Sequence, residues 1–260
     1  MMGRTHALTG WCAGLVVAPL IGAGTVAQAV VFATTTAGFA LLPDLDHPRA
    51  KASRLLGPLT RVLSWVLRRT SAAVYALTKG PRDEKKAGTH RHLSHTVLFA
   101  LGLGSLATAG TAAGGPWAVA GITVFALLLA ENALGDWMLL VIVGGITWWL
   151  VEAGPDAAVQ LDALSGWLGI AVTAGCITHC LGDSITESGC PFLFPIPIAG
   201  ETWYELRPPK FLRIRTGKKV ERLLIFPVFT VLAVLLLPGA WEGIVTIAER
   251  FFVPPAQAGT

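Results

Sequence analysis

Charged residues are scarce in this sequence, and they are missing altogether from two long stretches. Only 14% of the 260 residues are Asp, Glu, Lys or Arg, whereas a soluble domain carries about 25%. Residues 5–43 contain none of these four types, and neither do residues 92–130. Because about 20 apolar residues cross the hydrocarbon core as a helix, each stretch is long enough for two crossings and a turn. The pattern excludes a soluble globular fold and predicts an integral membrane protein.

The apolar stretches also lack the polar–apolar alternation of a transmembrane β-barrel. Backbone groups in lipid must then be satisfied within helices. Gly- and Pro-containing turns divide the two charge-free stretches at residues 22–24 and 114–116. Further apolar segments suited to spanning are residues 137–151, 163–182 and 223–248. We predict an all-α polytopic bundle of about seven spans, forming a single membrane domain over residues 1–260.

Lys and Arg are absent from residues 92–206. Of the 20 in the chain, 11 lie between residues 43 and 92 and 7 between residues 201 and 222. Cytoplasmic loops carry the excess of basic residues, so we expect residues 43–92 and 184–222 to be cytoplasmic loops of a multi-pass membrane protein. No basic run is interleaved with exposed aromatic residues. The positive charge therefore indicates topology, and we expect no nucleic-acid partner.

Cysteine is scarce as well, and its spacing excludes one kind of metal site. The four Cys residues lie in or beside apolar segments, and none forms a Cys-x-x-Cys pair. A thiolate zinc site is therefore not expected. Small apolar packing residues are the more ordinary interpretation.

The six His residues all fall at ends of apolar segments that this topology assigns to the cytoplasmic face. They come from four separate parts of the chain: His6; His47; His90, His92 and His95; and His179. Any one of them alone would be interpreted as a hydrogen-bonded surface residue. Their common face is what suggests a shared function, because ionisable groups at membrane depth are costly.

Carboxylates accompany these histidines. Asp44 and Asp46 precede His47, and Asp183 follows His179 by four residues, which places the last two on one helical face. Imidazole with carboxylate suits zinc, manganese or iron. We expect two or three divalent ions, zinc first and manganese as the alternative. The predicted ligands are His6, Asp44, Asp46, His47, His90, His95, His179 and Asp183.

Arg91 lies inside this cluster. A guanidinium beside metal ligands offers two parallel donors to the anionic oxygens of a phosphate group. The alternative is a basic anchor for topology, like the other basic residues of that loop. We expect Arg91, Asp46 and His95 to be the catalytic residues.

Residues 54–69 form an amphipathic stretch within the first basic loop. Apolar residues recur there at helical spacing, with four Arg residues among them. Two interpretations stay open: a helix lying in the interface of an anionic leaflet, or a helix packed on the other spans.

Four sequence blocks resemble the YdjM-type family of membrane-bound metal-dependent hydrolases. They are Thr5-His6, Leu-Leu-Pro-Asp-Leu-Asp-His-Pro at residues 41–48, His-Arg-His-Leu-Ser-His-Thr at residues 90–96, and residues 179–195. A weaker block is residues 214–221. Ser94 stands where the family usually has Thr, and Thr96 where it usually has Ser. His92 falls at a variable position, which argues against it as a ligand.

The resemblance implies a protein of the inner membrane with a hydrolase-like metal site. Together with the site's expected place at the headgroup level, it predicts a hydrolase acting on a phosphoester of a membrane lipid or lipid-linked substrate at the cytoplasmic face. One alternative is a non-catalytic, metal-stabilised membrane adaptor that binds a protein partner through the cytoplasmic loops; some family members are labelled as binding a DNA-damage repressor, which fits it. A metal transporter is a further alternative, but it predicts ligands at mid-membrane depth.

Overall fold

The computed structural model describes residues 1–252 except residues 49 and 51. Within that part of the chain all regular structure is helical, and strand-like pairing is limited to isolated bridges. The all-α prediction is therefore confirmed. The α-helices are α1 (Gly3–Val17), α2 (Val26–Phe39), α3 (Pro58–Thr78), α4 (Val97–Leu134), α5 (Trp137–Ala153), α6 (Ala157–Asp162), α7 (Ser165–Ser184), α8 (Phe226–Leu235) and α9 (Ala240–Phe252).

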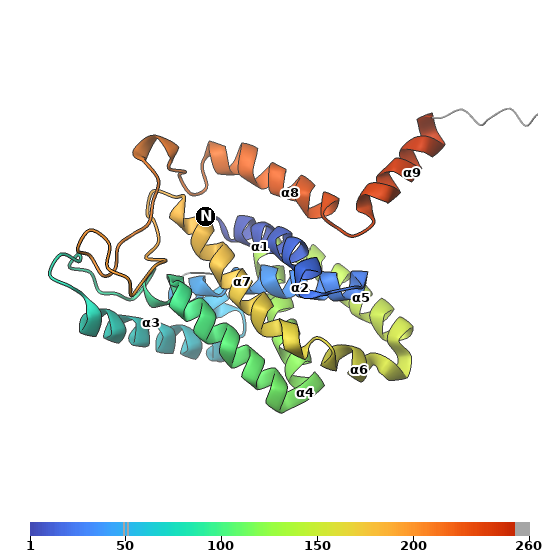
Figure 1. Cartoon of the computed structure of the whole chain (residues 1–260), viewed down its shortest axis with the longest axis horizontal. Helices are drawn as coiled ribbons and strands as arrows, with labels where there is room; N and C mark the ends of the chain where they lie inside the picture. Colours follow the sequence, from blue (N-terminus) through green and yellow to red (C-terminus); the bar gives the residue numbers. More distant parts are fainter. Residues whose placement is uncertain (49, 51, 253–260) are drawn as a thin grey trace, which may run out of the picture.

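The core of the molecule consists of α1, α2, α4 and α7, which pack on one another (Figure 1). Small residues let these backbones approach closely, as is common between membrane helices. A Cβ atom added to Gly38 of α2 would lie 2.2 Å from the carbonyl oxygen of Ala126 in α4. One added to Gly175 of α7 would lie 2.5 Å from the carbonyl oxygen of Thr36 in α2. Glycine is therefore required at both contacts.

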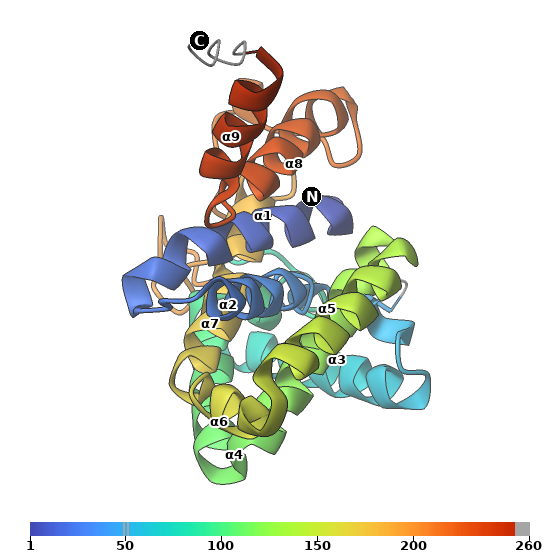
Figure 2. The same cartoon turned by 90° about the vertical axis from the view of Figure 1, so that its right-hand side faces the viewer.

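The break predicted at residues 114–116 is present inside α4. Gly115 has φ 54° and ψ −144°, values that a glycine adopts readily and other residues do not, and Pro116 follows it. The helix is thus two helices joined at a kink. Figure 2 shows α5 and α6 after it on the same side of the molecule, with α8 and α9 on the opposite side of α1.

The expected count of about seven spans is not confirmed. By length and composition, the described residues contain three helical segments suited to crossing a membrane, Val26–Asp46, Val97–Leu134 and Trp137–Asp162. A fourth arises if the bent pair Glu221–Leu235 and Ala240–Thr246 is counted as one span. Helix α1 has only 15 residues, which is short for a crossing. The segment 223–248 is not one straight helix, because its two helices meet at 82°.

Three short 3₁₀ turns and two irregular segments, residues 79–92 and 185–220, cover one end of the core. The turns are η2 (Pro43–Asp46), η3 (Ala52–Arg54) and η4 (Leu93–His95). Residues 185–220 have little regular structure apart from a 3₁₀ turn at Lys210–Leu212, and isolated bridges tie Thr186 to Ile214 and Cys190 to Leu206. These segments and α3 lie at the left of Figure 1, where α1 begins and α7 ends.

Candidate metal centre

The ends of α1, α2 and α7 bring the predicted ligands together. His6 lies on the first turns of α1, Asp44 and Asp46 on the turn η2 after α2, and His179 and Asp183 on the last turns of α7. His95 closes η4, directly before α4. His6, Asp46, His95, His179 and Asp183 have no solvent exposure, whereas Asp44 is partly exposed. Five buried ionisable side chains in one place need mutual compensation or a bound ion.

The imidazoles of His95 and His179 lie at the centre of the cluster and face each other through their Nε2 atoms, which are 3.2 Å apart. The Nδ1 atom of His179 lies 2.7 Å from the carbonyl oxygen of Ala40. A carbonyl oxygen only accepts, so this Nδ1 carries the proton and Nε2 of a neutral His179 carries a lone pair.

The Nδ1 atom of His95 is held in the same way. Ser94 Oγ donates to Asp46 Oδ2 at 2.7 Å and lies 3.0 Å from Nδ1 of His95, so it can accept the Nδ1 proton. Nε2 of a neutral His95 then also carries a lone pair. Two lone pairs at this separation repel each other unless a cation, either a proton or a metal ion, lies between them.

Electrostatics favours a positive charge at this point. Burial alone lowers the pKa of His95, but the charge of Asp46 and the hydrogen bond to it outweigh burial and raise that pKa to about 9. The Nδ1 atom of His95 is 3.5 Å from Asp46 Oδ2, and its Nε2 atom is 3.7 Å from Asp183 Oδ2. The cluster thus attracts a cation from both sides of the ring.

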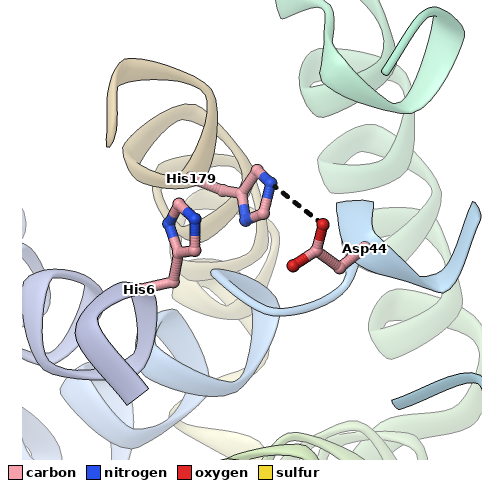
Figure 3. A group of neighbouring side chains, drawn as sticks. All are labelled: His6, Asp44 and His179. Carbon is pink, nitrogen blue, oxygen red and sulfur yellow. Dashed lines mark ion pairs between the residues drawn. The ribbon is translucent and has the colours of Figure 1, made fainter. Parts of the chain in front are cut away.

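Carboxylates and a third imidazole converge on the same point. The possible ligand atoms form two groups, and within each group they all lie within 4.8 Å of one another. One group is His6, Asp44 and His179, and the other is His95, His179 and Asp183. Figure 3 shows Asp44 facing the nitrogen of His179 that is 3.8 Å from its Oδ1, with the ring of His6 beside that of His179. Because Nδ1 of His179 is occupied, its Nε2 can bind one ion only, so the two groups overlap in one site.

His6 has ring nitrogens without hydrogen-bond partners, although it is fully buried. Its ring stacks on that of His179 at a centroid distance of 3.9 Å, and Nε2 lies 3.3 Å from Asp183 Oδ1 in a geometry that makes no hydrogen bond. The amino group of Met1 also contacts Asp183 Oδ1. Buried polar atoms without partners are rare, so those of His6 mark a place where a ligand is expected.

Asp46 is surrounded by protein donors and lies outside both groups. Besides Ser94, it contacts the backbone N–H of Arg91 at 2.9 Å and Nδ1 of His90 at 2.5 Å. These contacts leave its oxygens little capacity for an ion. Its geometry is that of a carboxylate that orients a ligand imidazole, His95, a common arrangement around protein-bound metals.

Arg91 joins the two buried carboxylates. Its backbone N–H donates to Asp46, and its Nη2 atom lies 3.0 Å from Asp183 Oδ2. The residue has φ 54°, a left-handed conformation that is uncommon for a non-glycine residue and clusters at functional sites. Its buried Nη1 atom has no hydrogen-bond partner.

A cleft of about 360 Å³ opens beside Arg91. Its lining includes Lys86, Arg207, Glu84 and Glu205. Lys86 lies 2.7 Å from Glu205 and 2.9 Å from Glu84, and Arg207 lies 3.1 Å from Glu205. Burial opposes the charge of Lys86, but these hydrogen bonds raise its pKa. Both cations therefore already have carboxylate partners, while Arg91 keeps an unpaired donor.

Three histidines lie outside both groups: His47 and His90, which were predicted as ligands, and His92, which was not. His47 packs edge-on against His90, with ring centroids 4.7 Å apart, and His90 is bound to Asp46. The Nδ1 atom of His92 is 2.7 Å from the carbonyl oxygen of His90, and its ring packs on Tyr75. Burial lowers the pKa of His92. The structure thus brings together His6, Asp44, His95, His179 and Asp183, and sets His47, His90 and Asp46 beside them.

Two groups that support the candidate ligands were not predicted from the sequence. Ser94 links Asp46 to His95, and the carbonyl of Ala40 fixes His179. Ser94 precedes a candidate ligand, but a serine beside a histidine is common, and a backbone carbonyl has no sequence signature at all.

The comparison with protein-family models gives one match. The model described as YdjM inner membrane protein matches residues 1–244. The chain belongs to the YdjM family. The resemblance inferred from the four blocks is therefore confirmed. Searches of curated proteins and of solved structures gave no match.

The YdjM match contains all eight predicted ligands and Arg91. The family description and the apolar helices together indicate an inner-membrane protein, as the family resemblance implied. For a YdjM member, the buried His and Asp side chains at one end of the helices form a group that could hold a metal ion.

Proposed function

We propose that this protein is a multi-pass, metal-dependent hydrolase that cleaves a phosphoester of a membrane lipid or lipid-linked substrate at the cytoplasmic face. The observation that carries the proposal is the 3.2 Å separation of the Nε2 atoms of His95 and His179, with each Nδ1 atom held by an acceptor. This combination presents two lone pairs to one point, with carboxylates around it.

The dimensions suit a divalent ion. With zinc–nitrogen bonds of about 2.0–2.1 Å in a tetrahedron, two imidazole nitrogens are roughly 3.3 Å apart. The two Nε2 atoms match that separation, and the carboxylate oxygens of Asp44 and Asp183, 3.8 and 3.7 Å from Nε2 of His179, are only a few tenths of an ångström farther than such ligands lie. Ligand imidazoles that donate Nδ1–H to a carbonyl or a hydroxyl–carboxylate pair are typical of metal sites. His95, His179 and a carboxylate of Asp44 or Asp183 would hold the ion, with His6 beside them, which leaves one tetrahedral position open for a water.

A bound divalent ion would supply an activated water and polarise a phosphoryl oxygen. The protein's own groups would do the rest. Arg91 would offer its unpaired Nη1 donor to an anionic oxygen while Nη2 stays on Asp183, and Asp46 with Ser94 would keep the ring of His95 in place. The neighbouring cleft offers room for the group beyond the phosphoester.

A lipid or lipid-linked substrate follows from location. The family description indicates the inner membrane, and the ligands lie at ends of apolar helices rather than at their centres. A site at that level meets phosphate-bearing headgroups. Basic residues in the two flanking loops support the cytoplasmic orientation.

The test measures metal content and turnover on the same detergent-purified samples. Substrates are a generic phosphodiester and mixed phospholipids, and the variants are His179→Ala and Asp183→Asn, with Asp156→Asn as a control at an exposed carboxylate distant in sequence from the ligands. We expect both site variants to lose metal and turnover while the control keeps both. Stoichiometric metal without turnover on any phosphoester would move the protein to the adaptor alternative. Equal turnover of wild type and His179→Ala would indicate a contaminating enzyme.

A further inference from the structure

Helix α3 presents its apolar side outward. Leu59, Val62, Leu63 and Val66 recur at helical spacing and are exposed, Leu59 and Val62 to 58% each. Trp65 and Leu77 are exposed as well. A helix that packs on the other spans would bury this stripe, so the structure decides against that interpretation of the amphipathic sequence. Figures 1 and 2 show α3 at the periphery of the molecule.

The inward side of α3 carries hydroxyl groups instead. Its buried residues are Thr60, Ser64, Ser71 and Tyr75. Its main packing partners are the turns η2, η3 and η4, not the long core helices. Ser71 donates to the carbonyl of Gly88 at 2.6 Å and accepts from the N–H of Leu93 at 3.2 Å. The polar side of α3 therefore holds the loop that carries Arg91 and His95.

Basic residues flank the exposed apolar stripe. Arg61 and Arg69 are exposed and Arg68 is partly exposed, and the guanidinium of Arg69 lies 5.6 Å from the centroid of the Trp65 ring. Arg68 and Arg69 near the middle of the helix, with Arg61 in its first turn, make a crossing of the hydrocarbon core costly. An apolar stripe beside arginines and a Trp suits the boundary between headgroups and acyl chains, where anionic lipids attract basic side chains.

We propose that α3 is a lipid-binding helix that lies in the interface of an anionic leaflet, with its apolar stripe in the acyl boundary and its arginines on lipid phosphates. The surface is separate from the metal centre and does not depend on its chemistry. The other side of α3 is hydrogen-bonded to the segment 88–95. Docking of α3 on the membrane therefore holds the cleft beside Arg91 at headgroup level.

The test uses the full chain in lipid nanodiscs, with an environment-sensitive fluorophore on a single introduced cysteine. The four native cysteines are buried, and can be replaced by Ser or Ala if they react. The labelled variants are Val62→Cys on α3, Val143→Cys on the exposed surface of α5, and Lys218→Cys in the second basic loop. Quenchers are a water-soluble ion and lipids with a nitroxide near the headgroup or near the chain end. Membranes are zwitterionic, or contain about one third phosphatidylglycerol.

We expect the label at Val62 to be quenched most by the shallow nitroxide, because interfacial helices lie about 5–10 Å into the headgroup–acyl boundary. The label at Val143 should be quenched most by the deep nitroxide, and the label at Lys218 by the aqueous ion. The shallow quenching at Val62 should be stronger in anionic membranes. In the Arg61→Gln/Arg69→Gln double variant, this dependence on anionic lipid should disappear while the label at Val143 behaves as before.

Two outcomes overturn the proposal. Quenching at Val62 by the aqueous ion as strong as at Lys218, in both membranes, would mean that the stripe faces water. Protection from all three quenchers, without dependence on lipid charge, would mean that a second copy or a protein partner covers the helix.

Discussion

Replacement of Ser94 by Ala tests how the metal centre is organised. Ser94 has no solvent exposure, donates to Asp46 at 2.7 Å and lies 3.0 Å from Nδ1 of His95. Without the hydroxyl, Asp46 loses a hydrogen bond to a charged acceptor, which contributes about 1.5–3 kcal/mol. Nδ1 of His95 keeps only Asp46 Oδ2, at 3.5 Å. Loss of such outer contacts lowers metal affinity by about 10–100-fold. At about 1.4 kcal/mol per factor of ten, that range matches the hydrogen-bond energy.

The assay is competition for zinc between the purified protein and a chromophoric chelator. Ser53→Ala is the matched control, because Ser53 is also buried but donates to the backbone carbonyl of Ala50, away from the ligands. Ser94→Thr keeps the hydroxyl, at the position where the family resemblance puts Thr, and should retain affinity within a few-fold. Unchanged affinity in Ser94→Ala, or a loss no larger than in Ser53→Ala, would refute the reasoning.

Three further predictions follow from the same structure. Arg91→Lys should keep the metal but weaken binding of a phosphate substrate by about tenfold or more, because Lys lacks the second parallel donor; unchanged KM would leave Arg91 as a topology anchor. Cysteines at Lys85 and Lys218, both exposed, should react with a membrane-impermeant reagent only after the cells are opened; labelling of intact cells would reverse the orientation. Gly38→Ala should lower the thermal midpoint, because overpacking costs about 1–3 kcal/mol, whereas Gly144→Ala, with open space around it, should not; equal midpoints would contradict the close packing of α2 on α4.

The sequence was sufficient to locate the candidate site. His6, Asp44, His95, His179 and Asp183 stand at ends of apolar segments, and the distribution of basic residues assigns these ends to one face. The different roles of Asp44 and Asp46, one facing His179 and the other bonded to Ser94, could not be predicted from the sequence. These two carboxylates are two residues apart on a 3₁₀ turn, and the turn directs one toward His179 and the other toward Ser94. Only the backbone path decides which of them faces the candidate metal site.

The fold was predicted in kind but not in the number of spans. Hydropathy detects apolar length, and it treated residues 223–248 as continuous, although Pro238 and Gly239 lie at the bend between α8 and α9 and Gly239 has φ 79°. The orientation of α3 was beyond sequence analysis for a different reason. An amphipathic helix gives the same sequence pattern whether its apolar side faces protein or lipid. The burial of Ser71 and Tyr75, with Ser71 bonded to the segment 88–95, was needed to decide which side of α3 faces outward.

The most direct test of the account is the metal content of the detergent-purified protein, measured by mass spectrometry for wild type and His179→Ala in parallel. The Nε2 atoms of His95 and His179 face each other at 3.2 Å, and the account predicts at least one equivalent of zinc or manganese in the wild type, lost when His179 is removed. Two or three ions are expected from the sequence, and a second equivalent that survives in His179→Ala would place another ion elsewhere. A folded, monodisperse wild type that binds no divalent metal even when it is supplied would contradict the central claim.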